Sequence, residues 1–430
     1  MEYFNRTADT MLQDLLDAFG AVLIEGPKWC GKTTTAGQLA KSTIRMQDTD
    51  MREEYMATAY SKPSLLLQGD TPRLIDEWQD APVLWDAVRT AVDQRAMPGQ
   101  FILTGSNTVD KSQTHHSGNG RIARMTMLPM SLWESRESTG EVSLRQLFDD
   151  PDYDIDGRRS DMRIEDLIFA ASRGGWPGTL AARSAKSQLL MARNYVRTVC
   201  SEDISRIDGK RRSEKLAMRI LQSYARNVSS LAKKTTMLED IVSSGEIDCG
   251  IDTFNEYVNA LERLFVIQDI EAWNPAIRSK TVVRSTPKRG FCDPSIAVAL
   301  LGLTPEALST QLKTFGFIFE QMCVRDLKAY TQGLYSHVAY YRDRYGLEAD
   351  FVLHLEDGRY ALVECKLGSH QIEEGASHLL ELKRLIREHN EGERQMPIRE
   401  PDLLIILTGG TMAYTRPDGV KVIPLGCLKD

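Results

Sequence analysis

The chain has 430 residues, a net charge of −7, 42% hydrophobic residues and 26% charged residues. This balance is typical of globular domains and excludes a wholly disordered or fibrous chain. A net acidic chain is also not one that coats nucleic acid over its whole surface, so any nucleic-acid contact has to be regional. At roughly 100–200 residues per domain, the length predicts two to four domains.

The cysteines and the hydropathy of the chain indicate in which cellular compartment the protein works. The seven cysteines are odd in number and show no CxxC spacing, which favours a reducing compartment over a disulfide framework or a zinc knuckle. The first twenty residues are polar and contain acids, unlike a signal or transit peptide. No apolar run approaches the ~20 residues that cross a bilayer. We therefore expect a cytoplasmic protein with no membrane partner.

The first third of the chain alternates short apolar runs with helical patterns. A short amphipathic helix is expected within residues 1–20. The alternation that follows is typical of a parallel sheet covered by helices. The expected strands are residues 21–25, 43–47, 72–76 and 101–105.

The motif GPKWCGKT at 26–33 fits the P-loop pattern GxxxxGK[ST] and lies between an expected strand and an expected helix at 34–42. Its glycines let the backbone wrap phosphates at a helix N-terminus. Lys32 is expected to reach the β- and γ-phosphates, and the Thr33 hydroxyl to ligate Mg²⁺. The sequence therefore predicts ATP and Mg²⁺ as cofactors, with ATP contacts from Gly26, Pro27, Lys28, Trp29, Cys30, Gly31, Lys32, Thr33 and Thr34.

Two further segments extend this site. Asp76 ends the strand at 72–76, where a Walker-B acid joins Thr33 in the Mg²⁺ shell, and Glu77 follows as the residue that polarises the attacking water. The strand at 101–105 ends in a polar tip, whose Asn107 is expected near the γ-phosphate. The alternatives are an exposed acidic loop and an ordinary strand with its turn.

The segment 118–135 offers an arginine finger. Arg121 or Arg124 could stabilise the transferred phosphoryl group of a neighbouring subunit, which would make the protein a homo-oligomer. The alternative is that both are ordinary surface arginines.

The order of these motifs resembles a prokaryotic AAA+ ATPase family that joins this N-terminal domain to a C-terminal domain of unknown function. The resemblance rests on the P-loop, the Asp76–Glu77 pair, LTGSN at 103–107 and LPMSLWE at 128–134. RGGWP at 173–177 and TPKRGFCDPSIA at 286–297 extend it over most of the chain. It implies an ATPase. The apolar run before Asp76 is shorter than the family pattern.

The middle of the chain is locally basic. Residues 137–162 are polar and are interpreted as a loop or linker, and helical periodicity returns over 164–240. Residues 193–234 contain eleven basic and four acidic residues, and residues 277–290 contain five basic residues and no acid.

Three apolar stripes, at 216–224, 237–242 and 254–264, precede an expected strand at 265–270 and two short strands within 279–292. This order is that of a winged helix, which the family resemblance also suggests. The third helix has few base-reading side chains, so we expect DNA binding through phosphates. The alternative is a helical lid or a protein-docking module.

The last third combines a helix at 315–332 with strand-like runs at 337–342, 349–355 and 360–367, a helix at 372–389 and strands at 402–408 and 420–424. Glu364 and Lys366 share one face of a strand. A turn at 356–359 would bring Asp350 alongside, so that Asp350 and Glu364 hold Mg²⁺. This resembles the PD-(D/E)XK nuclease signature, in which Glu320 matches the helical acid. The alternative keeps the fold without catalysis.

These observations predict an α/β protein with three domains. Residues 1–190 would form an AAA-type ATPase domain with a P-loop parallel sheet and a helical lid, residues 191–290 a helical, winged-helix-like DNA-binding domain, and residues 291–430 an α/β restriction-endonuclease-like domain. ATP hydrolysis would drive the DNA-directed half. The alternative is an ATP-switched regulator or scaffold whose C-terminal half docks a partner without catalysis.

Overall fold

The computed structural model describes residues 3–106, 118–243, 245, 248–273, 286–392 and 397–430. Its contacts divide the chain into two compact units. Unit 1 comprises Met1–Pro129 with Leu261–Val266, and unit 2 comprises Met130–Ala260 with Ile267–Asp430. The division falls after residue 129, not at the expected boundary at 190. No described helix is long and apolar enough to cross a membrane.

Unit 1 is built on a five-stranded sheet in the order β2-β3-β4-β1-β5. All of its pairings are parallel, as the alternation of strands and helices predicts. The strands are β1 (Ala21–Glu25), β2 (Ser42–Arg45), β3 (Arg73–Asp76), β4 (Phe101–Gly105) and β5 (Ile122–Thr126). The parallel order places the carboxyl ends of β1, β3 and β4 side by side at one edge of the sheet.

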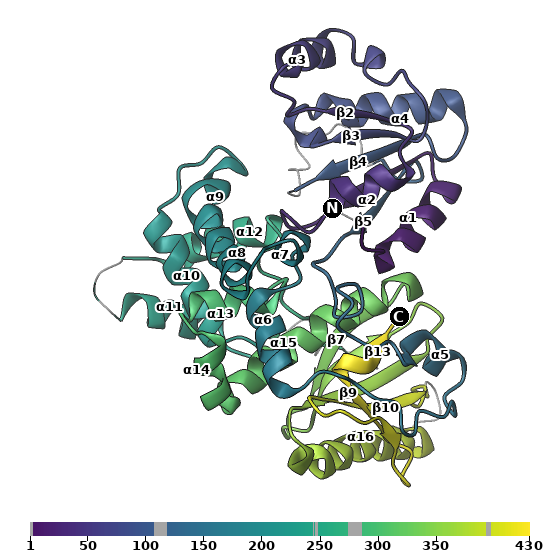
Figure 1. Cartoon of the computed structure of the whole chain (residues 1–430), viewed down its shortest axis with the longest axis vertical. Helices are drawn as coiled ribbons and strands as arrows, with labels where there is room; N and C mark the ends of the chain where they lie inside the picture. Colours follow the sequence, from purple (N-terminus) through teal and green to yellow (C-terminus); the bar gives the residue numbers. More distant parts are fainter. Residues whose placement is uncertain (1–2, 107–117, 244, 246–247, 274–285, 393–396) are drawn as a thin grey trace. The chain divides into compact units, whose positions relative to one another are not determined.

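Helices cover both faces of this sheet (Figure 1). They are α1 (Thr7–Ala18), α2 (Lys32–Leu39), α3 (Arg52–Ser61) and α4 (Val83–Arg95). Alternate β1 residues point to opposite faces: Val22 and Ile24 pack with residues of α1 and α2, and Ala21 and Leu23 pack with residues of α3 and α4. Every residue of β1 and β4 is buried, because helices cover both faces of the sheet.

The sequence did not identify β5 as a strand. Its pattern, Ile-Ala-Arg-Met-Thr, is buried only at Ile122 and Met125. An edge strand needs no continuous apolar run, because one side of it is open. The strand directly follows Arg121 and contains Arg124, the two arginine-finger candidates.

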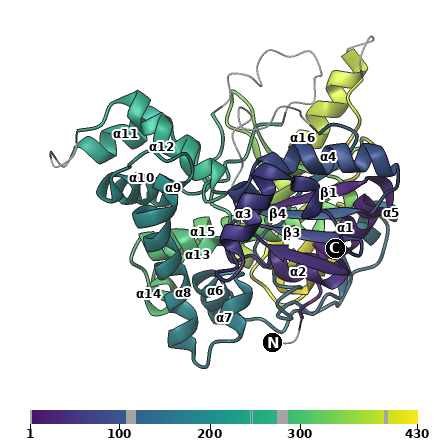
Figure 2. The same cartoon turned by 90° about the horizontal axis from the view of Figure 1, so that it is seen from above.

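A helical region of unit 2 begins at residue 164. Its elements are α6 (Ile164–Arg173), α7 (Pro177–Leu180), α8 (Ala185–Thr198), η4 (Val199–Asp203), α9 (Ile204–Arg206), α10 (Glu214–Arg226), α11 (Lys234–Val242), α12 (Ile251–Arg263, whose end belongs to unit 1), α13 (Pro294–Leu300) and α14 (Pro305–Thr310). The three expected apolar stripes thus lie on α10, α11 and α12. Figure 2 shows these three helices close together.

The strand expected at 265–270 forms only isolated bridges. Ile267 pairs with Phe291 and Ile270 with Lys288, both antiparallel. Residues 274–285, which hold most of the expected wing, lie outside the described residues. The described part therefore has three helices and a short antiparallel contact.

The last part of unit 2 is a mixed sheet in the order β11-β12-β10-β9-β8-β7. Helices α15 (Leu312–Tyr330) and α16 (Ile372–Gly392) lie on its two sides (Figure 1). The expected turn at 356–359 joins β8 and β9, which pair antiparallel. The strands are β7 (His337–Arg342), β8 (Glu348–His354), β9 (Tyr360–Lys366), β10 (Leu403–Thr408), β11 (Tyr414–Thr415) and β12 (Lys421–Pro424).

The segment 137–162 is more ordered than the expected linker. It contains β6 (Val142–Ser143) and α5 (Leu144–Asp149), and β6 pairs in parallel with β13 (Leu428–Lys429) near the chain end. Leu144, Leu147 and Phe148 are buried. The sequence did not predict this packing, because the acidic residues that follow α5 make the composition of the whole segment polar.

Candidate functional site

The P-loop joins β1 to α2 with the backbone that a phosphate cradle needs. Gly26 has φ +150°, and a Cβ there would stand 2.2 Å from the Met127 carbonyl oxygen. Gly31, at the N-cap of α2, has φ +102°. Both positions therefore require glycine. The first N–H groups of α2 point out of the helix into this loop.

Lys32 opens α2 and is 5% exposed. Its Nζ donates hydrogen bonds to the carbonyl oxygens of Gly26, at 2.9 Å, and Pro27, at 2.8 Å. The ammonium is thereby held over the loop, where phosphate oxygens could replace the two carbonyl acceptors.

The expected Mg²⁺ ligands meet at the end of β3. The Thr33 hydroxyl donates to Asp76 Oδ1 at 2.6 Å. The Thr104 hydroxyl, from the end of β4, donates to the same oxygen at 2.6 Å. A hydroxyl and a carboxylate are the hard oxygen donors that Mg²⁺ takes in P-loop proteins. The residues present therefore fit the ion, which would be held by Thr33 and Asp76.

Glu77 follows Asp76 in a left-handed backbone conformation, with φ 57°. Such a conformation is uncommon for a residue other than glycine and often marks a functional position. The Ser106 hydroxyl donates to Glu77 Oε1 at 2.9 Å, and the Gln79 amide donates to Oε2. Glu77 is thus oriented by two neighbours beside the Thr33–Asp76 pair.

Three other candidates have different outcomes. Asn107 lies outside the described residues. Arg121 forms an ion pair with Asp93 at 2.8 Å, and Arg124 contacts Glu25 at 3.3 Å. Both arginine side chains are 48% exposed. Their exposure suits an arginine finger and a surface arginine equally well.

The expected C-terminal residues form an acid–lysine cluster, defined here as Glu320, Asp350, Glu364, Lys366 and Lys288. Lys366 Nζ lies 2.9 Å from Glu364 Oε2. Lys288 Nζ lies 2.7 Å from Glu320 Oε1 and 3.2 Å from Asp350 Oδ1. Asp350 Oδ2 accepts a hydrogen bond from the Cys365 backbone N–H at 2.9 Å. The four predicted residues are therefore brought into one cluster.

Lys288 is the member of this cluster that sequence reasoning missed. It falls in the basic stretch at 277–290, for which the sequence predicts DNA contacts, but it is 5% exposed and holds two carboxylates inside the protein. Arg289 is likewise buried and forms an ion pair with Asp269. The sequence feature that could have indicated their burial is the presence of Pro287 and Phe291 on either side of the pair. Neither residue is available to contact phosphates.

Burial controls protonation in the cluster. Desolvation raises the pKa of Glu320 to about 8, Asp350 adds to the rise, and Lys288 opposes it. The pKa of Glu364 is also raised to about 8, first by desolvation and then by Asp350, against the effect of Lys366. Burial lowers the pKa of Lys288, but Glu320 and Asp350 more than offset this, and the net shift is upward. Lys288 therefore stays protonated.

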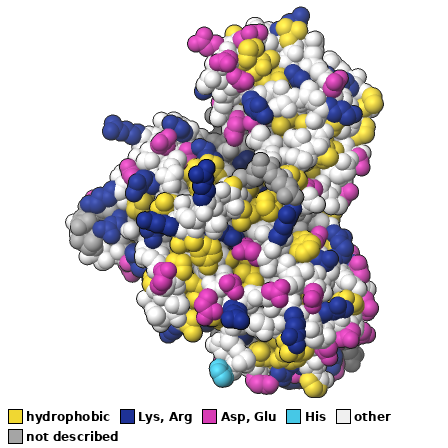
Figure 3. Space-filling view, in the orientation of Figure 1, with side chains coloured by type: hydrophobic (Ala, Val, Ile, Leu, Met, Phe, Trp, Pro, Cys, Tyr) yellow, Lys and Arg dark blue, Asp and Glu magenta, His cyan; other side chains and the backbone are white. Residues whose placement is uncertain are grey.

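Several basic residues of the segment 193–234 are engaged in ion pairs. Arg206 pairs with Glu202, Arg212 with Asp208 and Arg226 with Asp240. Lys210 and Arg211, in the loop before α10, are exposed. Figure 3 shows further Lys and Arg side chains on the face of the helical region. The surface positive charge is thus smaller than the residue count indicates.

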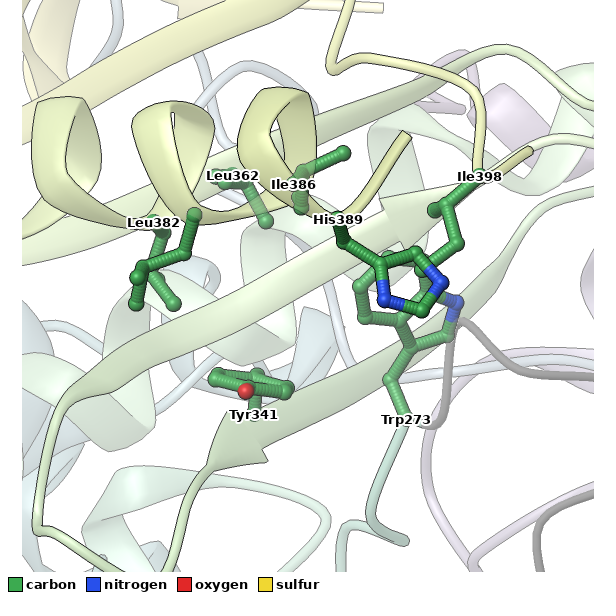
Figure 4. A pocket seen from close by; sticks show the side chains of 8 residues that line it. Trp273, Tyr341, Leu362, Leu382, Ile386, His389 and Ile398 are labelled. Atoms are coloured by element: carbon green, nitrogen blue, oxygen red, sulfur yellow. The ribbon is translucent and has the colours of Figure 1, made fainter. Parts of the chain in front are cut away.

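A separate apolar pocket of about 180 Å³ lies between the C-terminal sheet and α16. In Figure 4, Leu382, Ile386 and His389 extend from α16 toward Tyr341 and Trp273. The Trp273 ring also packs against the Tyr360 ring, with centroids 4.9 Å apart and ring planes tilted by 41°. Among the described residues its lining has no carboxylate, which distinguishes it chemically from the acid–lysine cluster.

Residues 18–135 match the model of the AAA domain family. Together with the parallel sheet and the P-loop geometry, this match defines an AAA-type P-loop domain in unit 1. Residues 164–307 match a domain of unknown function, DUF8612, and residues 315–428 match another, DUF4143.

Over longer stretches, the chain is similar to two mycobacterial proteins. They are the uncharacterized proteins Rv2008c of Mycobacterium tuberculosis and Mb2031c of Mycobacterium bovis. Each is 24% identical over 369 residues, which cover 83% of this chain and 72% of the mycobacterial protein.

Among solved structures, the Walker-type ATPase PABY2304 of Pyrococcus abyssi has a TM-score of 0.40 and 12% identity, covering 69% of this chain and 96% of that one. The Aeropyrum pernix ORC1 protein in complex with DNA has a TM-score of 0.21 and 12% identity, covering 71% and 94%.

Proposed function

We propose that unit 1 binds ATP with Mg²⁺ and hydrolyses it. The observation that carries this proposal is the meeting of Thr33 and Asp76 at 2.6 Å beside the P-loop. Lys32 would exchange its two loop carbonyls for the β- and γ-phosphates, and the N–H groups of α2 would bind the same phosphates. When bound, Mg²⁺ would neutralise charge on those oxygens.

Glu77 is the residue that we assign to the attacking water. Its carboxylate is held by Ser106 and Gln79, so it is oriented before the substrate arrives. Residues at the end of β4 would detect whether the γ-phosphate is present. One of them, Thr104, donates a hydrogen bond to Asp76. Arg121 or Arg124 would act on a neighbouring copy of the chain.

The test of hydrolysis is Glu77→Gln. The amide keeps the shape of the side chain but cannot take a proton, so we expect ATP affinity within about threefold of the parent and turnover lower by roughly 10²–10⁴-fold. Glu53→Gln, on the exposed side of α3, is the matched control. Parental turnover in Glu77→Gln would remove Glu77 from this role.

For unit 2 we propose a DNA-directed role for a nuclease-like domain. Support comes from the assembly of Glu320, Asp350, Glu364 and Lys366 in one cluster and from the exposed Lys210 and Arg211. Glu364 has a free oxygen that could ligate Mg²⁺ or Mn²⁺ for cleavage. The alternative is a regulator or scaffold in which the ion pairs are purely structural.

DNA binding is tested by replacing Lys210 and Arg211 with alanine. Each phosphate interaction that the substitutions remove should lower the log–log salt slope by about 0.9 on duplex DNA. Arg212→Ala is the contrasting variant, because Arg212 pairs with Asp208 and should affect folding instead. No binding by the parent at ~50 mM salt, or an unchanged slope in the double variant, favours the docking alternative.

A further inference from the structure

An imidazole that the sequence pattern did not include faces the acid–lysine cluster. His378, on α16, has its Nδ1 3.6 Å from Glu364 Oε1. Both atoms are buried, and neither has a hydrogen-bond partner among the described residues. The Glu364 side chain is 1% exposed. A buried, unpaired carboxylate oxygen costs free energy unless something satisfies it.

The surrounding contacts occupy the other carboxylate oxygen of Glu364 and both oxygens of Asp350. Glu364 Oε2 contacts Lys366, Asp350 Oδ1 contacts Lys288, and Asp350 Oδ2 accepts from the Cys365 N–H. A cation that enters here therefore finds Glu364 Oε1 and His378 Nδ1 as donors that no other described group occupies.

The spacing suits a single ion. With metal–ligand bonds of ~2.1 Å, two donors on one ion stand roughly 3.0–3.6 Å apart for bond angles of about 90–120°. The observed 3.6 Å lies at the upper end of this range.

Helix α16 is shaped to bring His378 to this position. Gly375 lies one turn earlier, and a Cβ there would stand 3.1 Å from Lys366 Cε and 3.6 Å from Glu364 Cβ. The glycine thus lets the helix approach β9 closely. The His378 side chain is 36% exposed, which leaves an entry path from solvent.

We propose that Glu364 and His378 bind a divalent transition-metal ion in preference to Mg²⁺. An imidazole nitrogen is a ligand that transition metals accept readily, whereas Mg²⁺ prefers an all-oxygen shell. Water would complete the coordination. The inference deepens the nuclease-like role proposed for unit 2, but the binding itself requires neither DNA nor ATP.

The test is calorimetric titration of the full chain with MnCl₂ and, separately, MgCl₂, without nucleotide or DNA. We expect the parent to bind Mn²⁺ at least tenfold more tightly than Mg²⁺. His378→Ala should lower Mn²⁺ affinity by more than tenfold. His378→Asp replaces the nitrogen ligand with an oxygen ligand, so it should reduce the ratio of Mn²⁺ affinity to Mg²⁺ affinity. His389→Ala, on the same helix but in the apolar pocket, should behave as the parent does.

Three outcomes would overturn the proposal: no Mn²⁺ binding by the parent, equal affinity for the two ions, or parental Mn²⁺ affinity in His378→Ala with its melting temperature unchanged. Failure of DNA cleavage would count against the nuclease role alone, because the titration measures ion binding directly.

Discussion

In the nucleotide site the ligand-facing groups come mainly from one continuous segment, Gly26 to Thr33, whereas the acid–lysine cluster draws its side chains from α15, β8, β9 and the segment before α13. The first site presents backbone N–H groups and holds its lysine with loop carbonyls. The second neutralises most of its carboxylates with its own lysines. A site of the first kind is arranged for a ligand, while one of the second kind is largely satisfied without it.

Removing the acid of the nucleotide site should have the largest effect. Asp76→Asn loses the anionic ligand next to Thr33 and keeps the shape of the side chain, so we expect ATP turnover to fall by at least about 100-fold. Asp80→Asn, four residues later, is the control. Turnover of the Asp76 variant within threefold of the parent, measured by phosphate release, would mean that the metal is held elsewhere.

Substitutions in the acid–lysine cluster should lower the free energy of unfolding. Lys288→Met leaves Glu320 and Asp350 without their shared cation, and breaking a buried pair costs about 3–5 kcal/mol of unfolding free energy. Lys366→Met is the matched comparison, since the Lys366 side chain is 16% exposed and solvent can replace part of its effect. Chemical denaturation measures both. Equal destabilisation of the two variants would contradict the special position of Lys288.

A smaller effect is expected from pH. Because the pKa of folded Glu364 is raised to about 8 from its ordinary value of 4.5, the folded chain holds a proton that the unfolded chain releases. Stability from this group is therefore complete below about pH 4.5 and is lost as the pH rises toward 8. In EDTA, Glu364→Gln should flatten the fall in melting temperature between pH 5 and 8. An unchanged pH profile would place the proton on another carboxyl group.

The same contrast explains what the sequence could predict. The strands β1, β3 and β4 were identifiable because buried parallel strands are short apolar runs, and the P-loop because its residues are adjacent in the chain. Edge strand β5 and the packed segment at 137–162 were not, since neither needs a continuous apolar pattern.

In unit 2, Asp350, Glu364 and Lys366 could be placed together because one turn joins their strands. Lys288 and His378 reach the same cluster through tertiary packing, and Lys288 lies 62 positions before Asp350 in the chain. A basic residue in a basic stretch is normally interpreted as exposed, and only burial identifies it as an internal cation.

The central claim, that unit 1 is an ATP site built on the P-loop, is tested most directly by calorimetric titration of ATP and Mg²⁺ into the full chain and its Lys32→Ala variant, with Lys41→Ala as an exposed control. The lysine supplies the one side-chain charge on the β- and γ-phosphates that the loop amides do not replace. The account predicts measurable binding by the parent and the control and none by Lys32→Ala. Affinity of the Lys32 variant within twofold of the parent would contradict it.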